Sequence, residues 1–249
     1  MAYQLLGIAI APGVAIALFM YFRDSSNREP LKWLFLCFLL GMLSTVLAIY
    51  LEDVVYIGLK QLVYDEDSAA FKILSAFIRF AFIEEMLKYC MLRWSVYNKK
   101  AFDEPLDGIV YAVMVSMGFA TIENILYVYQ YGLSVGIMRM FLSVPGHACF
   151  AILMGYYVGL AKFNKGRKGN GYIFIGLGLA ILFHGLYDSF LMLSESSIVQ
   201  AYISSGMLVL GAIGSYIIAL ILSIRAIRIH RKASKIATAQ ANAAKNEHL

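Results

Sequence analysis

Long apolar stretches alternate with short polar segments along the chain. A helix needs about 20 apolar residues to cross the hydrocarbon core of a bilayer, and most of these stretches reach that length. The pattern therefore predicts an all-α transmembrane bundle of about seven spans, at residues 5–22, 33–51, 71–92, 108–131, 134–161, 171–193 and 198–224.

Residues between and beyond the spans add two expectations. Segment 52–70 carries apolar residues at near-helical spacing, and predicts either a continuation of the second span or an amphipathic helix on the membrane surface, which would be an eighth helix. Residues 1–232 are predicted to form a single polytopic domain. The tail at 233–249 is rich in Ala, Lys and Asn, and is predicted to be disordered.

Composition supports a membrane protein. Hydrophobic residues make up 61% of the chain and charged residues 15%, against about 25% charged in ordinary soluble domains. The net charge of +5 does not indicate a nucleic-acid partner, because basic residues gather just after the last span, where they would meet anionic lipid headgroups. They are Arg225, Arg228, Arg231, Lys232 and Lys235.

The charge of the loops predicts the orientation. Cytoplasmic loops of membrane proteins carry an excess of Lys and Arg. Loops 23–32, 93–107 and 162–170 carry three or four such residues each, whereas loop 52–70 holds only Lys60 against five acidic residues. We therefore expect a multi-pass protein of the cell membrane, with the N-terminus outside and the C-terminus in the cytoplasm.

Ionisable residues lie inside four of the predicted spans. A charged side chain at the centre of a bilayer costs at least about 2.5–3.5 kcal/mol, so such residues face one another or a wet cavity. We expect them to meet in one intramembrane site. The residues expected at this site are Glu84, Glu85 and Lys88 in the third span, Glu123 and its neighbouring amide Asn124 in the fourth, His147 in the fifth, and His184 with Asp188 in the sixth.

Spacing within each helix pairs some of these residues. Positions four apart share a helix face, so Lys88 can hold Glu84 ionised, and Asp188 can orient His184. Glu85 has no such local partner and must find one on another helix. Pro145 and Gly146 are expected to weaken the helix just before His147.

Two glutamates, two histidines and an aspartate can activate water in two ways. A carboxylate paired with a histidine can act as a general base while a second polar group stabilises the oxyanion. Alternatively, a metal held by these residues lowers the pKa of its bound water. Both chemistries remain open from the residues alone.

The motifs, taken together, resemble the PrsW family of bacterial intramembrane proteases. They are Glu84-Glu85-x-x-Lys88, Phe119-x-x-x-Glu123-Asn124, His147 after Pro-Gly, and His184-x-x-x-Asp188, in this order over residues 71–193. That family is itself similar to the superfamily of CAAX prenyl endopeptidases. The resemblance implies an intramembrane endopeptidase whose catalytic core is 71–193.

The resemblance also implies roles for the residues. Glu84 and Glu85 would activate water with His147 and His184, and Lys88, Glu123, Asn124 and Asp188 would support them. We favour a metal-independent reaction with no cofactor; zinc, held by Glu85, His147 and His184, is the alternative. The implied partners are the lipid bilayer and a single-pass membrane protein as substrate, such as an anti-sigma factor at its first cleavage.

Two other classes of function compete with this hypothesis. Buried Glu, His and Asp also mark proton relays in transporters, although no inverted repeat is apparent in the sequence. A non-catalytic scaffold or immunity-type protein of the same fold is the other alternative. The presence of every motif residue favours the protease.

Overall fold

The computed structural model describes residues 2–23, 27–164 and 166–246, and the side chains of 5–23, 27–164 and 166–236. Every regular element in these ranges is helical. The elements are α1 (Ala2–Arg23), α2 (Leu31–Leu62), α3 (Ala69–Leu74), the π-helix η1 (Ser75–Phe82), α4 (Ile83–Ser95), α5 (Pro105–Tyr131), α6 (Leu133–Phe141), α7 (Ser143–Phe163), α8 (Arg167–Glu195), α9 (Ser197–Gln200) and α10 (Ser205–Asn246).

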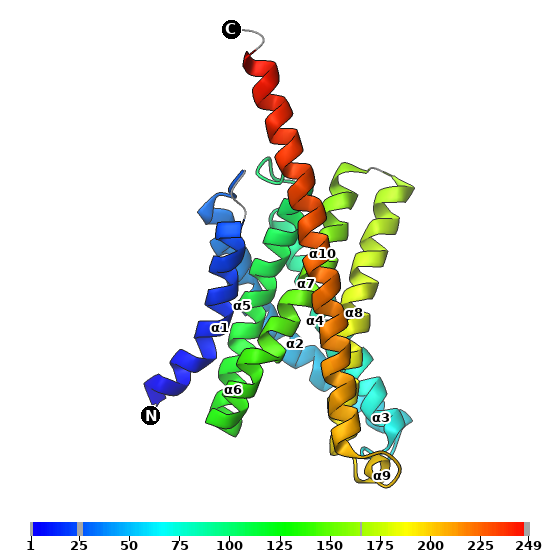
Figure 1. Cartoon of the computed structure of the whole chain (residues 1–249). Coiled ribbons are helices and arrows are strands. Elements are labelled where there is room, and N and C mark those ends of the chain that lie inside the picture. Colours follow the sequence, from blue (N-terminus) through cyan, green and yellow to red (C-terminus); the bar gives the residue numbers. More distant parts are fainter. Residues whose placement is uncertain (1, 24–26, 165, 247–249) are drawn as a thin grey trace.

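The helices form an up-and-down bundle (Figure 1). Six described segments are long and apolar enough to cross a membrane, with bounds Leu5–Arg23, Leu31–Leu62, Pro105–Tyr131, Leu133–Phe163, Arg167–Glu195 and Ser205–Ile236. The remaining predicted span, 71–92, which is the third along the chain, lies in the continuous helical segment α3–η1–α4. The all-α membrane bundle predicted from the sequence is thus confirmed.

Two boundaries differ from the prediction, and one open alternative is resolved. The second span continues as one helix to Leu62, which is one of the two alternatives predicted for segment 52–70, so no separate surface helix forms in 52–62. The last span begins at Ser205, because Ser197–Gln200 form the short helix α9. The tail expected to be disordered is helical as far as Asn246, in keeping with its many alanines, the best helix-forming residue, while residues 247–249 lie outside the described range.

Helix α5 forms the centre of the bundle. It is the most buried of the six spans and packs against α1, α2 and α7. Its sequence is apolar on all sides, the pattern of a helix surrounded by protein. Residues at 119–124 of α5 are therefore placed inside the bundle.

Close contact of backbones fixes α5 against α2. A Cβ atom on Gly41 would lie 1.9 Å from the carbonyl oxygen of Val115, and one on Gly118 would lie 1.9 Å from that of Phe38. Small residues at such crossings let membrane helices approach closely. The pairing of Gly41 with Gly118 thus sets the depth at which α5 presents its polar residues.

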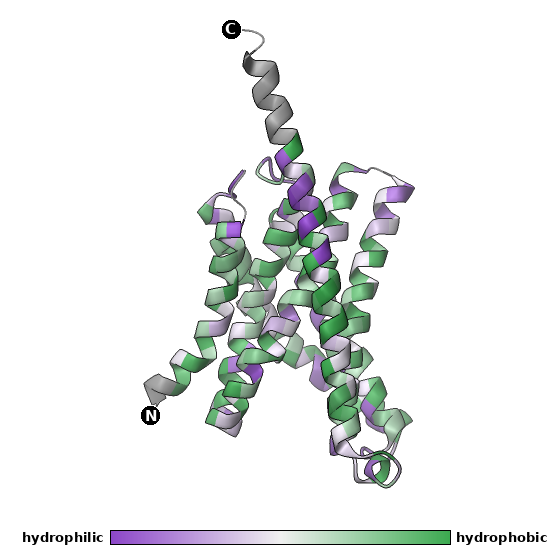
Figure 2. Cartoon of the chain, in the orientation of Figure 1, coloured by the Kyte–Doolittle hydropathy of each residue, from purple (hydrophilic) through white to green (hydrophobic). Residues whose placement is uncertain are grey.

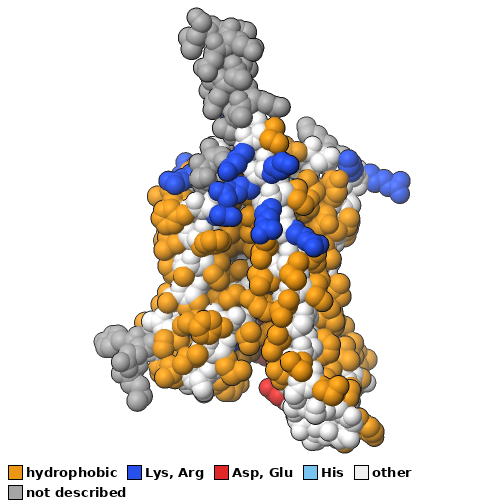
Figure 3. Space-filling model, viewed as in Figure 1, with side chains coloured by type: hydrophobic (Ala, Val, Ile, Leu, Met, Phe, Trp, Pro, Cys, Tyr) orange, Lys and Arg blue, Asp and Glu red, His pale blue; other side chains and the backbone are white. Residues whose placement is uncertain are grey.

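The two ends of the bundle differ in charge. Because the helices alternate in direction, the segments that join α1 to α2, α4 to α5 and α7 to α8 lie at one end, and Figure 3 shows Lys and Arg side chains gathered there on the face in view. Figure 2 shows hydrophilic positions at this end of α10 and others at mid-height, between apolar stretches.

At the opposite end of the bundle, Asp67 in the turn between α2 and α3 binds the start of α9. Its Oδ2 accepts hydrogen bonds from Ser197 N (2.9 Å), Ser197 Oγ (2.5 Å) and Ile198 N (3.2 Å) at the start of α9. The hydrogen bonds from Ser197 lower the pKa of this carboxyl below its usual value. Asp67 therefore ties the α2–α3 turn to the α8–α10 connection.

Substitution at the α2–α5 crossing tests this packing. A Gly118→Ala methyl would overlap the backbone of α2, so the helices must separate; overpacking of this kind costs about 1–3 kcal/mol or more. We expect a clear drop in the thermal unfolding midpoint of the purified protein. Gly178→Ala on α8 is the control, because its Cβ meets nothing within 4 Å; an equal drop in both variants would contradict the proposed crossing.

Candidate active site

The third segment of the bundle carries the two glutamates. The π-helix η1 leads directly into α4, whose first turn contains Glu84 and Glu85. π-Helical stretches are uncommon and occur often at functional sites. Both carboxylates point to the interior, with Glu84 5% exposed and Glu85 fully buried.

Lys88, one turn further along α4, binds both carboxylates. Its Nζ lies 3.0 Å from Glu84 Oε2 and 2.8 Å from Glu85 Oε1. It also lies 3.3 Å from His147 Nδ1 and 4.1 Å from the centre of the Phe119 ring. The predicted pair of Glu84 with Lys88 is present. The expectation that Glu85 has no partner on its own helix is wrong, because Lys88 lies three residues further along α4 and binds it as well.

Helix α7 supplies His147 close to its start. The ring accepts from Lys88 at Nδ1, because an ammonium can only donate, so the proton is on Nε2, which lies 2.8 Å from Glu123 Oε2. Ser116 Oγ donates to the backbone oxygen of His147 at 3.0 Å and ties α7 to α5. His147 is thus held in one tautomer between α4 and α5.

The helix break before His147 differs from the prediction. The expected single span 134–161 is divided at Leu142 into α6 and α7. Pro145 lies in the first turn of α7, where its missing N–H removes no helical hydrogen bond. The chain therefore breaks three residues before Pro145, and Pro145 with Gly146 begins the new helix.

Helix α8 brings His184 to the other side of Glu85. Its Nδ1 lies 3.0 Å from Glu85 Oε1, and its Nε2 lies 3.2 Å from Asp188 Oδ2. Phe150 stacks on the imidazole, with ring centres 5.1 Å apart and planes at 16°. The predicted contact of Asp188 with His184 is present, and each nitrogen of the ring faces a carboxylate.

Four of the predicted residues form one compact group. One ligand atom from each of Glu84, Glu85, His147 and His184 lies within 4.8 Å of the others, and all four residues are buried. The expected meeting of the paired glutamates with both histidines is therefore present in the structure. We call these four residues together with Lys88 the polar cluster.

Two further carboxylates border the polar cluster. The side chains of Glu123 and Asp188 are 17% and 25% exposed, whereas Glu85 and Lys88 are fully buried. Both lie in the halves of α5 and α8 that are away from the end of the bundle where the Lys and Arg side chains gather, which we call the basic end. Exposure thus increases from the cluster towards Glu123 and Asp188.

Asn124 lies outside the polar cluster. Its amide donates to the backbone oxygen of Ala9 at 2.9 Å and accepts from Arg139 Nε at 3.0 Å. The resemblance of the motifs implied a supporting role in the site for this residue, whereas these hydrogen bonds link helices. Asn124 joins α1, α5 and α6.

Arg139 of α6 was missed by the sequence analysis. Its Nη2 lies 2.9 Å from Glu123 Oε2, and its guanidinium lies 3.9 Å from the centre of the Tyr127 ring. A charge in the apolar stretch 134–161 was the available signal, but only the fold shows which carboxylate it meets. Arg139 fixes Glu123, and Glu123 in turn fixes His147.

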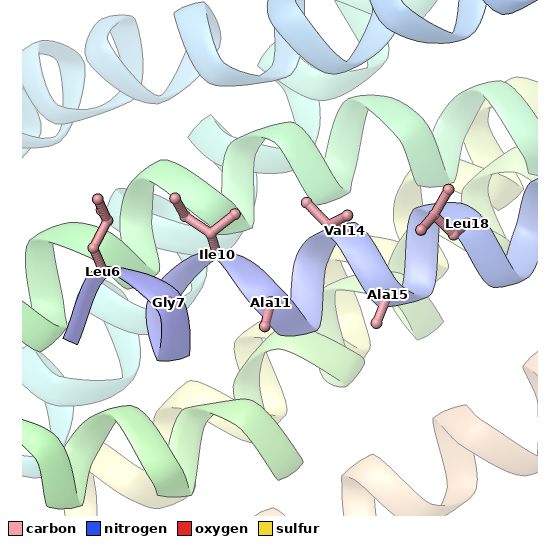
Figure 4. Close-up of a pocket in the computed structure, with 7 residues that line it drawn as sticks. All are labelled: Leu6, Gly7, Ile10, Ala11, Val14, Ala15 and Leu18. Carbon is pink, nitrogen blue, oxygen red and sulfur yellow. The ribbon is translucent and has the colours of Figure 1, made fainter. Parts of the chain in front are cut away.

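A shallow depression on the outer face of α1 is unrelated to the polar cluster. It has a volume of about 570 Å³ and is lined by Leu6, Gly7, Ile10, Ala11, Val14, Ala15 and Leu18 (Figure 4). The lining contains no ionisable side chain. The chemistry is therefore expected in the interior and not in this depression.

The chain is similar to known proteins over most of its length. The family described as "PrsW family intramembrane metalloprotease" matches residues 29–221. No solved structure matches the chain.

Curated relatives of the chain carry the name Protease PrsW. The protein of Geobacillus kaustophilus is 36% identical over 193 residues, covering 78% of this chain and 82% of the relative. That of Bacillus subtilis is 33% identical over 186 residues, with 75% and 82% covered. That of Clostridioides difficile is 35% identical over 203 residues, with 78% and 81% covered.

A double-mutant cycle tests the link between α6 and α5. Breaking a buried ion pair costs up to about 3–5 kcal/mol because one charge is left unpaired, so Arg139→Met and Glu123→Gln should each lower the thermal unfolding midpoint. The double variant should lose less than the sum of the two. Lys60→Met is the control, because the Lys60–Glu66 pair is about half exposed and exposed pairs contribute little; additive losses at 123 and 139 would contradict the link.

Proposed function

Because the chain belongs to the PrsW family of intramembrane proteases, we propose that it hydrolyses a peptide bond of a single-pass membrane protein by means of the polar cluster. The observation that carries this proposal is the burial of Glu84, Glu85, His147 and His184 within 4.8 Å of one another. An anti-sigma factor is the proposed type of substrate, as the resemblance of the motifs implies.

Glu85 is the proposed general base. Its Oε1 is held by Lys88 and His184, while its Oε2 is buried and has no hydrogen-bond partner among the described residues. Buried polar atoms without partners are rare, and a water molecule can fill this position. Glu85 would take a proton from that water while the oxygen attacks the carbonyl carbon of the substrate.

The remaining residues would support the same step. The ammonium group of Lys88 places positive charge beside the reacting carbonyl, where it would offset the negative charge of the tetrahedral intermediate, and His184 would hold Glu85 in position. Collapse of the intermediate breaks the C–N bond, and the proton taken by Glu85 passes to the leaving amine. Glu123 and Asp188 would hold the orientation of His147 and His184.

The description of the family includes a metal, and the donors of the polar cluster are of kinds that bind zinc. The ammonium group of Lys88, however, already donates hydrogen bonds to the atoms that would bind the metal. Its Nζ lies 2.8–3.3 Å from one such atom in each of Glu84, Glu85 and His147. A divalent ion at this position would lie beside a fixed positive charge. The residues do not fit such an ion while Lys88 is in place, and the proposed reaction uses none.

The proposed topology places the basic end in the cytoplasm and the N-terminus outside. It is supported by the Lys and Arg residues of the joining segments and by their position at one end of the bundle. Glu123 and Asp188 would then lie in the outer half of the membrane. A substrate would approach the polar cluster from that side.

Substitution of Glu85 tests the catalytic role. Glu85→Gln keeps the shape of the side chain and removes the base, so we expect cleavage of a co-expressed, doubly tagged single-pass substrate to fall by at least about 10²-fold. Glu84→Gln, His147→Ala and His184→Ala should also be inactive. Glu195→Gln, an exposed carboxylate at the end of α8, is the control; normal cleavage by Glu85→Gln with intact folding would refute Glu85 as the base.

Reporter fusions test the topology. A reporter active only in the cytoplasm should be active when fused within 97–103 or at 164–167, and inactive when fused at 63–67. The expected pattern follows from the basic segments at one end of the bundle. The inverse pattern would place Glu123 and Asp188 in the cytoplasmic half and would move the proposed entrance to that side.

A further inference from the structure

The two histidines of the polar cluster share one arrangement. In each ring Nδ1 faces the cluster and Nε2 faces a carboxylate, Glu123 for His147 and Asp188 for His184. Histidines that bind metals show the same arrangement, in which the second nitrogen donates to a carboxylate or carbonyl group. The polar cluster therefore has the form of a cation site made of two imidazoles and two carboxylates.

A cation of the chain itself stands in this site. The ammonium group of lysine has three N–H donors, and Lys88 Nζ has three acceptors in the cluster: Glu84 Oε2 at 3.0 Å, Glu85 Oε1 at 2.8 Å and His147 Nδ1 at 3.3 Å. The ring of Phe119 lies 4.1 Å from the nitrogen, within the range of a cation–π contact. The donors of Lys88 and the inward-facing atoms of three cluster residues are thus matched one to one.

Zinc would need the same lone pairs. Zinc binds nitrogen and carboxylate oxygen at about 2.0–2.2 Å, so it cannot use Glu85 Oε1 and His147 Nδ1 while the ammonium holds them. Two positive charges within a few ångströms in a buried site also repel each other strongly. Lys88 cannot leave for solvent easily, because its side chain is fully buried.

We propose that the ammonium group of Lys88 occupies the position of a metal ion in the polar cluster, and that removal of this charge converts the cluster into a zinc site. In the native protein the cation is the Lys88 side chain itself, four residues from Glu84 and three from Glu85 on the same helix. Its position is therefore set by folding and does not depend on the concentration of free metal ions. The inference rests on the proposed function for the importance of the cluster, but zinc binding is measured without any substrate.

The experiment is zinc binding by purified protein in detergent. Three proteins are dialysed against zinc chloride: the wild type, Lys88→Met, and the double variant Glu84→Gln with Lys88→Met. Bound zinc is measured by mass spectrometry, and thermal unfolding is measured with and without zinc. We expect both variants to bind about one zinc more per chain than the wild type, at least tenfold more tightly than any zinc it binds. Zinc should raise the unfolding midpoint of the variants alone.

The double variant and two further variants make the result decisive. The double variant keeps Glu85, His147 and His184 as ligands. It also removes the negative charge of Glu84, one of the two carboxylates that lose their counter-charge in Lys88→Met. It can therefore be tested even if Lys88→Met does not fold. His147→Ala in the double variant should abolish the added zinc. Lys100→Met, which removes an exposed lysine, should bind zinc as the wild type does.

The opposite results would overturn the inference. Equal stoichiometric binding by the wild type and the variants would mean that Lys88 does not exclude the ion. A folded double variant that binds no additional zinc would mean that the cluster is not a metal-type site. Either result leaves the effect of Glu85→Gln on proteolysis untouched, so failure of this inference is distinguishable from failure of the proposed function.

Discussion

The structure depends on one buried interaction, the ammonium group of Lys88 among Glu84, Glu85 and His147. Two adjacent carboxylates in the interior of a membrane bundle would repel each other and would lack hydration, a combination that costs several kcal/mol. Lys88 lies on the same helix at the spacing that lets it reach both. It also reaches α7, so the interaction that makes the two glutamates tolerable also fixes the position of a histidine.

Two chains of contacts lead outward from this centre. One runs from His147 through Glu123 to Arg139 of α6, and the other from Glu85 through His184 to Asp188. Each imidazole is therefore held from both nitrogens and cannot rotate without breaking a contact to a charged group. Phe150 stacks on His184, and the apolar surroundings strengthen every one of these electrostatic contacts.

Contacts within one helix could be predicted from the sequence, and contacts between helices only in part. The pairs of Glu84 with Lys88 and of His184 with Asp188 follow from the fixed spacing of four residues. The meeting of the helices was expected from the cost of isolated charges in a membrane, but that argument does not select partners. The role of Arg139 depends on the break at Leu142, which turns α6 towards α5, and no local motif marks that break. The π-helix at Ser75–Phe82 was not anticipated either.

The proposed hydrolysis inside an apolar bundle also needs a supply of water. The exposed fractions of the polar side chains indicate from which side water would reach the polar cluster. Glu85 and Lys88 are fully buried, while the side chains of Glu123 and Asp188, which touch the two histidines, are partly exposed. The polar side chains thus connect the interior with the half of the bundle opposite the basic end. The close pairing of Gly41 with Gly118 holds α5 at a fixed depth, so Glu123 stays at this border. In the proposed reaction, the reacting groups would lie in apolar surroundings, where electrostatic contacts are strong, and water would reach them along this partly exposed polar edge.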